Sequence, residues 1–343
     1  MHMADALISP AVGATMWAAG AVVTCYAAKK IDKDFPEQKI PLMGVLGAFV
    51  FAAQMINFAI PGTGSSGHLG GGMLLSILLG PHAGFLVMTS ILTIQALLFA
   101  DGGLLALGCN IFNLAVLPCY VAYPLIYRKI VGSSPSRIRI ATGVAFSVII
   151  GLQLGALGVV TETTASGLSD LPFQTFSLFM LPIHFVIGAI EAAVTTAVLW
   201  YLLQEAPTLF DFSGQVKTAT SFSLRRAVLV TLFVTVMTAG ILSWFASTQP
   251  DGLEWAVIKT AGSEEIRNSS TWHEMAALWQ GKTSLLADYQ LTFFSSSVKT
   301  EQQAWPAVNE GTSLAGVLGS VLTLLAAGAV GAGCRAFAKR SAG

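Results

Sequence analysis

Charged residues are scarce in this sequence. Only 10% of the 343 residues are charged and 54% are hydrophobic, whereas an ordinary soluble domain has roughly 25% charged residues. This composition argues against a water-soluble globule and favours a protein embedded in a lipid bilayer. The 18 basic and 18 acidic residues cancel, so no net positive field favours nucleic acid, and we expect no nucleic-acid partner.

Cysteine is also scarce, and the sequence has no Cys-x-x-Cys pair. Cys25, Cys109 and Cys119 lie within apolar stretches, and Cys334 lies near the C-terminal end. This distribution is typical of small apolar residues in a membrane and not of a disulfide framework or a zinc site.

The glycine-rich stretch 62–67 matches the spacing of a dinucleotide-binding loop, but its context does not fit. An apolar run precedes it, and the next acidic residue is Asp101, so nothing is placed to hold a ribose. We expect instead a backbone that packs tightly beside a site.

Two further motifs are incomplete. Residues 280–283 resemble the end of a phosphate-binding loop, but Ala276 stands where the first glycine is required. His273 and Glu274 begin a zinc-protease pattern whose second histidine is replaced by Ala277. We therefore expect no ATPase activity of the chain's own and no tightly bound organic cofactor.

Long apolar runs are abundant. A membrane-spanning helix needs about 20 largely apolar residues, and eight segments meet this need: 10–28, 41–59, 82–100, 104–127, 137–160, 173–203, 225–246 and 313–337. The first resembles a retained span more than a signal peptide, because basic residues follow it at Lys29 and Lys30 instead of preceding it.

The short basic loops indicate a ninth crossing. With eight spans, the loops around Lys29 and Arg128 fall on opposite sides, against the rule that short basic loops face the cytoplasm. If segment 67–79 also crosses, although thirteen helical residues rise only roughly 20 Å, the basic loops share one side. The N-terminus and the loop at 60–68 then both face outward.

These spans predict two modules in an all-α integral membrane protein. Residues 1–205 form a seven-span transmembrane part, 206–224 a cytoplasmic connection, and 225–343 a two-span hairpin around a long extracytoplasmic segment at 247–312.

The first two residues carry a possible metal site. The terminal amine of Met1, the amide nitrogen of His2 and Nδ1 of the His2 ring can chelate one metal, with His68 as fourth ligand. Planar nitrogen ligation favours Ni(II) or Cu(II). A cloning remnant explains His2 equally simply at this point, and a lone histidine in a glycine-rich loop is often a surface residue.

His184 and Glu191 form a second candidate, since they stand two helical turns apart within one predicted span. Ionisable residues inside a membrane are often functional. A structural pair joined by hydrogen bonds is the alternative, and the sequence does not decide between them.

Beyond these candidates, the chain resembles the substrate-specific M subunits (NikM/CbiM) of energy-coupling factor (ECF) transporters for nickel and cobalt. The similar stretches are residues 1–10, 61–72, 79–85, 95–99, 101–104 and 106–113, together with His184, Gly188 and Glu191 in the last span. Residues 250–255, Pro-Asp-Gly-Leu-Glu-Trp, resemble the signature of the accessory N component, here fused behind the M subunit.

The resemblance implies that Met1, His2 and His68 hold the metal, with Asn110, His184 and Glu191 as possible supporting residues. It implies a non-enzymatic, multi-pass subunit in a bacterial inner membrane, with its N-terminus outside, that imports Ni(II) or Co(II). It also implies separate partners, namely a transmembrane coupling subunit (T/Q) and cytoplasmic ATPase subunits (A/O). Nickel is slightly preferred. The alternatives are cobalt uptake for cobalamin synthesis, a membrane metal sensor, and an intramembrane enzyme that uses His184 and Glu191.

Overall fold

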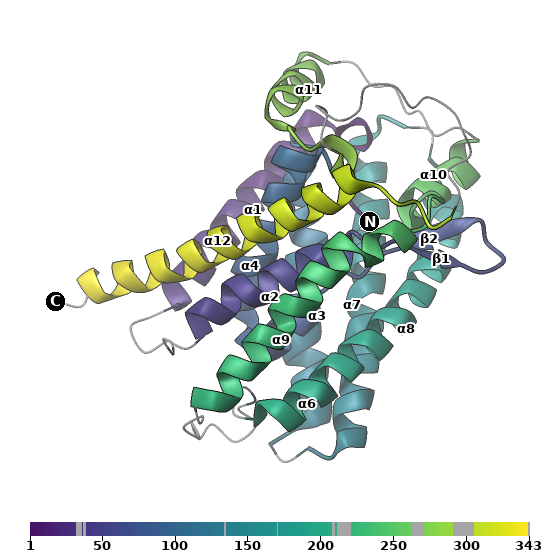
Figure 1. The fold of residues 1–343 in the computed structure, drawn as a ribbon. Coiled ribbons are helices and arrows are strands. Elements are labelled where there is room, and N and C mark those ends of the chain that lie inside the picture. The colour runs from purple at the N-terminus through teal and green to yellow at the C-terminus, as the bar shows by residue number, and fades with distance from the viewer. Residues whose placement is uncertain are drawn as a thin grey trace.

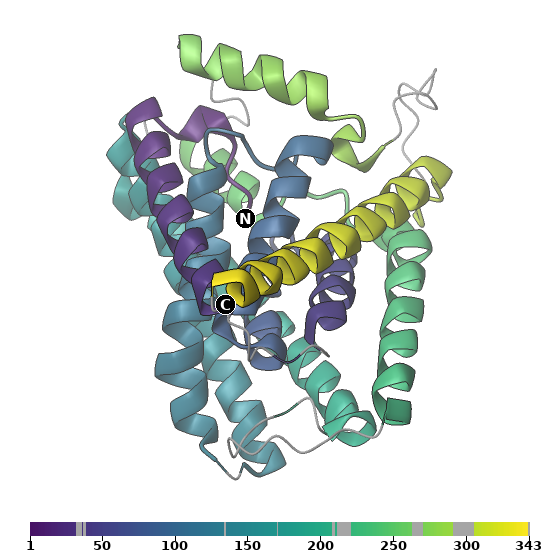
Figure 2. The ribbon, with the colours of Figure 1, turned by 90° about the vertical axis from the view of Figure 1, so that its left-hand side faces the viewer.

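The computed structural model describes residues 1–31, 36, 39–133, 135–169, 171–207, 210, 221–262, 270–290 and 305–341. Long helices form a bundle, and short helices and loops cover one of its ends (Figures 1 and 2). The N-terminus lies inside this covered end and not on its surface (Figure 2).

The first module contains most of the described elements. They are η1 (Asp5–Leu7), α1 (Pro10–Lys30), α2 (Lys39–Gln54), β1 (Phe58–Ile60), β2 (Ser65–Gly67), α3 (Gly72–Leu79), α4 (Pro81–Ile94), η2 (Gln95–Phe99), α5 (Leu107–Ile111), η3 (Phe112–Tyr127), α6 (Arg128–Val131), α7 (Arg137–Ser166) and α8 (Phe173–Glu205). The second module contains α9 (Ser221–Gly240), η5 (Leu242–Phe245), α10 (Gly252–Ala261), α11 (Thr271–Thr283), η6 (Ala287–Tyr289) and α12 (Glu310–Ser341).

The predicted class, an all-α integral membrane protein, is confirmed. Within the described residues, six helical stretches are long and apolar enough to cross a membrane: α1, α4 with η2, α5 through α6, α7, α8 and α12. The α2 helix is apolar but has only 16 residues. One feature was not predicted, an antiparallel hairpin in which β1 pairs with β2.

The short segment predicted to cross at 67–79 is helical only from Gly72 to Leu79. Eight residues rise roughly 12 Å, and all eight are buried within the protein. The helix begins late because the backbone before it is not helical, and Gly71 has a φ of +78°, a conformation that favours glycine. A stretch without regular structure at 68–71 therefore leads into a buried half-length helix.

The accessory helices α9 and α12 pack along α2 of the first module. Small residues permit this close approach. A Cβ atom on Gly44 would lie 2.6 Å from the carbonyl oxygen of Leu324, and one on Gly319 would lie 2.3 Å from the ring of Phe51. The two modules therefore form one packed unit.

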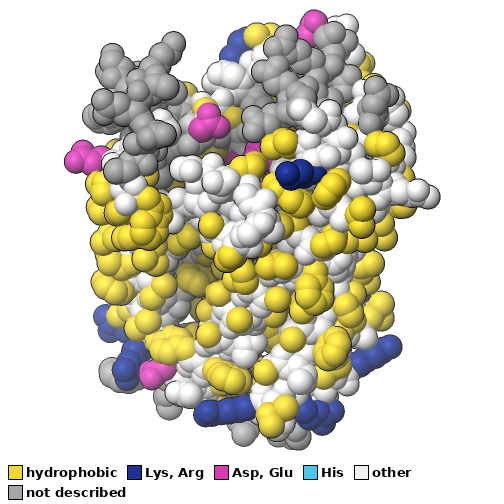
Figure 3. All heavy atoms as spheres, turned by 90° about the vertical axis from the view of Figure 1, so that its right-hand side faces the viewer, with side chains coloured by type: hydrophobic (Ala, Val, Ile, Leu, Met, Phe, Trp, Pro, Cys, Tyr) yellow, Lys and Arg dark blue, Asp and Glu magenta, His cyan; other side chains and the backbone are white. Residues whose placement is uncertain are grey.

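Charge is distributed unevenly along the bundle. In Figure 3 a broad apolar belt separates an edge rich in Lys and Arg from an opposite end that carries Asp and Glu. The basic edge corresponds to α6 and the adjoining ends of α7 and α9, which lie opposite α10, α11 and the β hairpin (Figure 1). Most of the predicted connection at 206–224 lies outside the described residues.

Candidate metal centre

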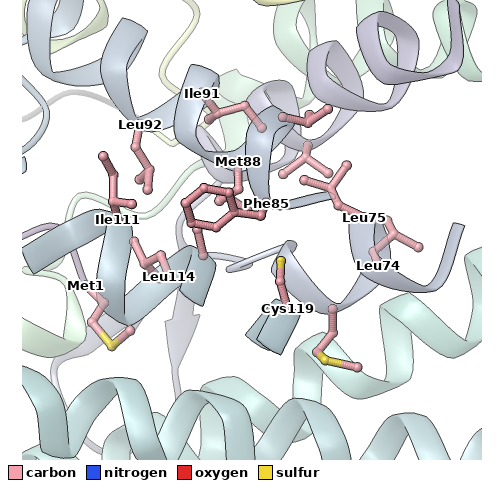
Figure 4. Close-up of a cluster of buried hydrophobic side chains, with 14 of the residues drawn as sticks. Met1, Leu74, Leu75, Phe85, Met88, Ile91, Leu92, Ile111, Leu114 and Cys119 are labelled. Atoms are coloured by element: carbon pink, nitrogen blue, oxygen red, sulfur yellow. The ribbon is translucent and has the colours of Figure 1, made fainter. Parts of the chain in front are cut away.

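The N-terminal segment is threaded into the protein interior. Met1 is 5% exposed, and Met3 and Ile8 are fully buried. The Met1 side chain lies among core residues that include Ile111 and Leu114 (Figure 4). Burial of this apolar side chain anchors the first residue of the chain, and with it the terminal amine.

Asn110 fixes the main chain of Met3 by a reciprocal pair of hydrogen bonds. The Met3 amide donates to Oδ1 of Asn110 at 2.8 Å, and Nδ2 of Asn110 donates to the Met3 carbonyl at 3.2 Å. Buried backbone groups must find such partners. Asn110 thus supports the N-terminal segment without contacting the candidate ligands themselves.

Two glycines leave space for the same segment. Gly102 has a φ of +86°, and a Cβ atom there would lie 2.8 Å from Nδ2 of Asn110. A Cβ atom on Gly103 would overlap the side chain of Asp5. Gly102 and Gly103, in the stretch that resembles the family, therefore leave room for the chain terminus.

The structure brings Met1, His2 and His68 together. The terminal amine donates to Nε2 of His68 at 3.0 Å and to Oδ2 of Asp251 at 2.8 Å. The rings of His2 and His68 stack, with centroids 5.1 Å apart and planes inclined by 14°. The amine and both imidazoles therefore occupy one small region.

His68 is held in the form that a metal ligand requires. It lies in the loop before α3, where Nδ1 donates to the carbonyl of Leu69 at 3.1 Å, so Nε2 keeps a free lone pair. The same Nε2 atom accepts the hydrogen bond from the Met1 amine, so its lone pair already points toward the candidate site.

The ring of His2 faces an acidic partner. Its Nδ1 lies 3.2 Å from Oδ1 of Asp101, whose Oδ2 accepts a 2.5 Å hydrogen bond from the hydroxyl of Tyr289. The chelate requires Nδ1 of His2 to bind the metal, so this contact between Nδ1 and Asp101 must be given up when the metal binds. Carboxylates that orient metal-binding histidines are a common arrangement around metal sites.

A cavity of about 440 Å³ adjoins the candidate ligands. It is lined by both histidines and by carboxylates from the two modules, namely Asp5, Asp101, Asp251, Glu254 and Asp288. The centre is therefore reached through a polar, acidic space.

Within the described part of the chain, no three side chains of the His, Cys, Asp or Glu types are grouped in a way that could hold a metal. A metal at this position would therefore depend on main-chain nitrogen atoms in addition to the two imidazoles. The predicted ligand set has that composition.

His184 and Glu191 do not form the acid–base pair that the sequence suggested. Nδ1 of His184 donates to the carbonyl of Met180 within its own helix at 2.8 Å. Glu191 instead accepts hydrogen bonds from the amides of Gly70 at 2.7 Å and Gly71 at 2.9 Å. Glu191 therefore holds the loop that carries His68, while His184 lines a small cavity beside Met1 and His68.

Glycine-rich residues 62–67 form the turn and second strand of the β hairpin. Gly62 and Gly64 have positive φ angles in this turn, and a Cβ atom on Gly67 would lie 2.5 Å from Ile187 on α8. The backbone at Gly67 therefore packs closely against α8, as expected for this stretch.

The accessory module contributes residues that the sequence did not identify as part of the site. Asp251 and Tyr289 are two of them. A third is His273, whose Nε2 donates to the carbonyls of Asp5 at 3.1 Å and Ile8 at 3.0 Å. Gln280 donates to the carbonyls of Ala96 and Gly102. His273 of the incomplete zinc-protease motif thus contacts the N-terminal segment, and Gln280 of the incomplete phosphate-loop motif contacts the backbone on either side of Asp101. Of these residues, only Asp251 lies in a sequence motif that pointed to it, the signature of the accessory component at residues 250–255.

Comparison with known proteins agrees with this two-part organisation. The family model for the CbiM cobalt uptake substrate-specific transmembrane region matches residues 2–209, and that for the PDGLE domain matches residues 225–336. A putative metal transport protein of Haloquadratum walsbyi is 37% identical, over 61% of this chain and 93% of that protein. A putative fused nickel transport protein NikMN of Archaeoglobus fulgidus is 33% identical, over 62% and 68%.

A solved structure shares the fold of the first module. The crystal structure of a truncated transition metal transporter is 34% identical and aligns with a TM-score of 0.53, covering 60% of this chain and 99% of that chain.

The fused NikMN protein of Rhodobacter capsulatus is 31% identical, over 61% of this chain and 63% of that protein. The chain therefore belongs to the CbiM family of cobalt uptake substrate-specific transmembrane regions, with a PDGLE domain fused behind that region.

Proposed function

We propose that this protein is the substrate-binding membrane subunit of an ATP-driven ECF importer for nickel or cobalt ions. One observation carries the proposal: the terminal amine of Met1 lies 3.0 Å from Nε2 of His68. Two nitrogen donors at right angles on one metal, each at about 2.1 Å, are roughly 3.0 Å apart. A metal that replaces the shared proton is thus accommodated with little movement of either donor.

The proposed ligands are four nitrogen atoms. They are the Met1 amine, the amide and Nδ1 of His2, and Nε2 of His68. The first three close fused chelate rings, and the amide coordinates once it has lost its proton. Such a planar set suits Ni(II), and Co(II) can be held by the same atoms.

Nickel is the slightly preferred cargo. Two relatives whose names call them fused are named as nickel transport proteins, whereas a relative in Chlorobium limicola is named as the cobalt transport protein CbiM. Cobalt uptake for cobalamin synthesis by the same mechanism is the alternative.

The transport step relies on other subunits. The chain is a transporter component and not an enzyme, and residues 280–283 lie at the end of α11, not in a phosphate-binding loop. We assign the energy supply to cytoplasmic ATPase subunits and a transmembrane coupling subunit. With the basic edge of Figure 3 facing the cytoplasm, the N-terminus and the metal centre face outward across a bacterial inner membrane.

Metal content tests the proposal. Protein with a native N-terminus, purified after growth with trace nickel and cobalt, should carry about one ion per chain by mass spectrometry of the metal. Bound nickel should give the visible absorption of a planar nitrogen site. A protein that binds neither ion under these conditions contradicts the proposal. A metal sensor would bind the ion but leave cellular uptake unchanged when the gene is deleted.

A further inference from the structure

Asp251 connects the accessory module to the first atom of the chain. Its Oδ1 accepts hydrogen bonds from the amides of Leu253 and Glu254, both at 2.8 Å, and so caps the N-terminus of α10. Its Oδ2 accepts from the Met1 amine, also at 2.8 Å. The two oxygens therefore have separate tasks, one within the accessory module and one at the metal centre.

The Asp251 carboxylate is held firmly in place. Glu254 completes a capping box by accepting a hydrogen bond from the Asp251 amide at 3.0 Å. Although burial opposes ionisation, the positively charged amine lowers the pKa of Asp251 below its ordinary value. The side chain therefore presents a fixed negative oxygen to the amine.

The loops that carry Asp251 and His68 are joined to each other. The Ser66 amide donates to the carbonyl of Pro250 at 2.8 Å, and its hydroxyl donates to that of Gln249 at 2.7 Å. A Cβ atom on Gly252 would lie 3.2 Å from the His184 ring. The relative position of Asp251 and His68 is thus set by two loops that are hydrogen-bonded to each other.

The terminal nitrogen has two partners in different directions. As an ammonium group it donates one proton to Nε2 of His68 and another to Oδ2 of Asp251. A metal bound between the amine and His68 replaces the first of these protons. The metal-bound amine still has two N–H bonds, so the hydrogen bond to Asp251 can persist.

We propose that Asp251 is a positioning residue for the metal site. By holding one N–H of the amine, it fixes the rotation of the amine so that the nitrogen lone pair is directed toward His68. The accessory module thereby completes a site whose ligands all belong to the first module. This inference rests on the proposed function, because it assumes that the amine is a ligand.

Asp251→Asn separates this role from helix capping. Asparagine is an equally good N-cap, so Oδ1 can still cap α10, but the amide nitrogen that replaces Oδ2 cannot accept from the amine. Loss of a partner that orients a metal ligand typically lowers affinity by about 10- to 100-fold. We expect a loss of this size in nickel affinity of the full-length protein, together with a changed visible absorption of the bound nickel.

Two other variants make the test specific. Asp251→Ser also provides a helix cap but does not reach the amine, so it should show the same loss. Glu274→Gln, on the exposed face of α11 in the same module, should bind nickel as the native protein does. Thermal unfolding without nickel should be similar for Glu274→Gln and the native protein, whereas both Asp251 variants should unfold at a lower temperature, because each leaves the buried amine without its anionic partner.

The outcomes distinguish this inference from the proposed function. If the native protein binds nickel and either Asp251 variant binds it with the same affinity and absorption, Asp251 does not position the amine, while the proposed function stands. If the native protein does not bind nickel, the proposed function fails, and this inference fails with it. A loss confined to the Asp251 variants supports both.

Discussion

The terminal amine of Met1 donates a 3.0 Å hydrogen bond to Nε2 of His68, although the two residues are 67 positions apart in the chain. Apolar burial of Met1, the main-chain contacts of Asn110 and the glycines at 102 and 103 bring the amine there. The loop before α3 brings His68.

Replacement of His68 tests its role as a ligand. His68→Ala removes one of four nitrogen donors and leaves water in its place. Loss of a supporting partner lowers metal affinity by at most roughly 100-fold, so loss of a ligand should lower nickel affinity by more than this. Calorimetric titration in detergent measures this change. His82→Ala is the control, because His82 bonds Tyr120, away from the candidate site, and should bind nickel normally. Native affinity in His68→Ala excludes His68 from the site.

Glu191 should affect the metal site through the loop that carries His68. In Glu191→Gln, the amide nitrogen faces one of the two glycine amides and cannot accept from it, which leaves a buried donor unpaired at a cost of about 1–3 kcal/mol. We expect lower thermal stability and weaker nickel binding. Thr196→Val on the same helix loses only a bond to its own helix backbone and serves as the control. If both variants match the native protein, Glu191 does not support the loop.

Membrane topology is testable by labelling single cysteines in a background without the native ones. A reagent confined to the outside should reach cysteines near Gly64 and Ser270. It should not reach those near Lys33, Ser134 or Lys217, which lie outside the described residues. This pattern follows if residues 68–71 and α3 together cross most of the bilayer. Labelling of Ser134→Cys from outside contradicts the proposed orientation.

The need for other subunits can be measured in two ways. The purified chain should not hydrolyse ATP, because it has no phosphate-binding loop. Cells that express it without coupling and ATPase subunits should accumulate no more nickel than cells without it, whereas co-expression of those subunits should restore uptake. Efficient uptake by the chain alone would indicate a channel or another class of transporter.

Much of the fold could be predicted because its signals are local. Apolar runs gave the long helices, and the parity of the basic loops identified the unusual segment before Leu79. The bounds of that segment were wrong, since hydropathy does not show that Gly71 adopts a left-handed backbone and delays the helix. The small β hairpin was missed for a similar reason: three-residue strands in a glycine-rich loop have no apolar alternation to reveal them.

The candidate site could be predicted only in part. Met1 and His2 are adjacent, so their chelating geometry is a local property. The contributions of Asp251 and Tyr289 depend on contacts across 250 and 188 positions of the chain, which no spacing rule reports. Likewise, the helical period places His184 and Glu191 on one face of their helix. It does not show that the two side chains have different hydrogen-bond partners.

The central claim is that the first nitrogen atom of the chain is a metal ligand. One residue added before Met1, with the mass of the intact protein confirmed, converts the amine into an amide and moves the free terminus out of register. Both histidines remain in place, yet the planar site loses two of its four donors. Calorimetric titration with nickel, together with the visible absorption of the complex, is the most direct test. We predict that high-affinity binding collapses and that the planar absorption disappears. Native affinity with an unchanged spectrum in the extended protein would contradict the terminal chelate and direct the search for the site toward His184.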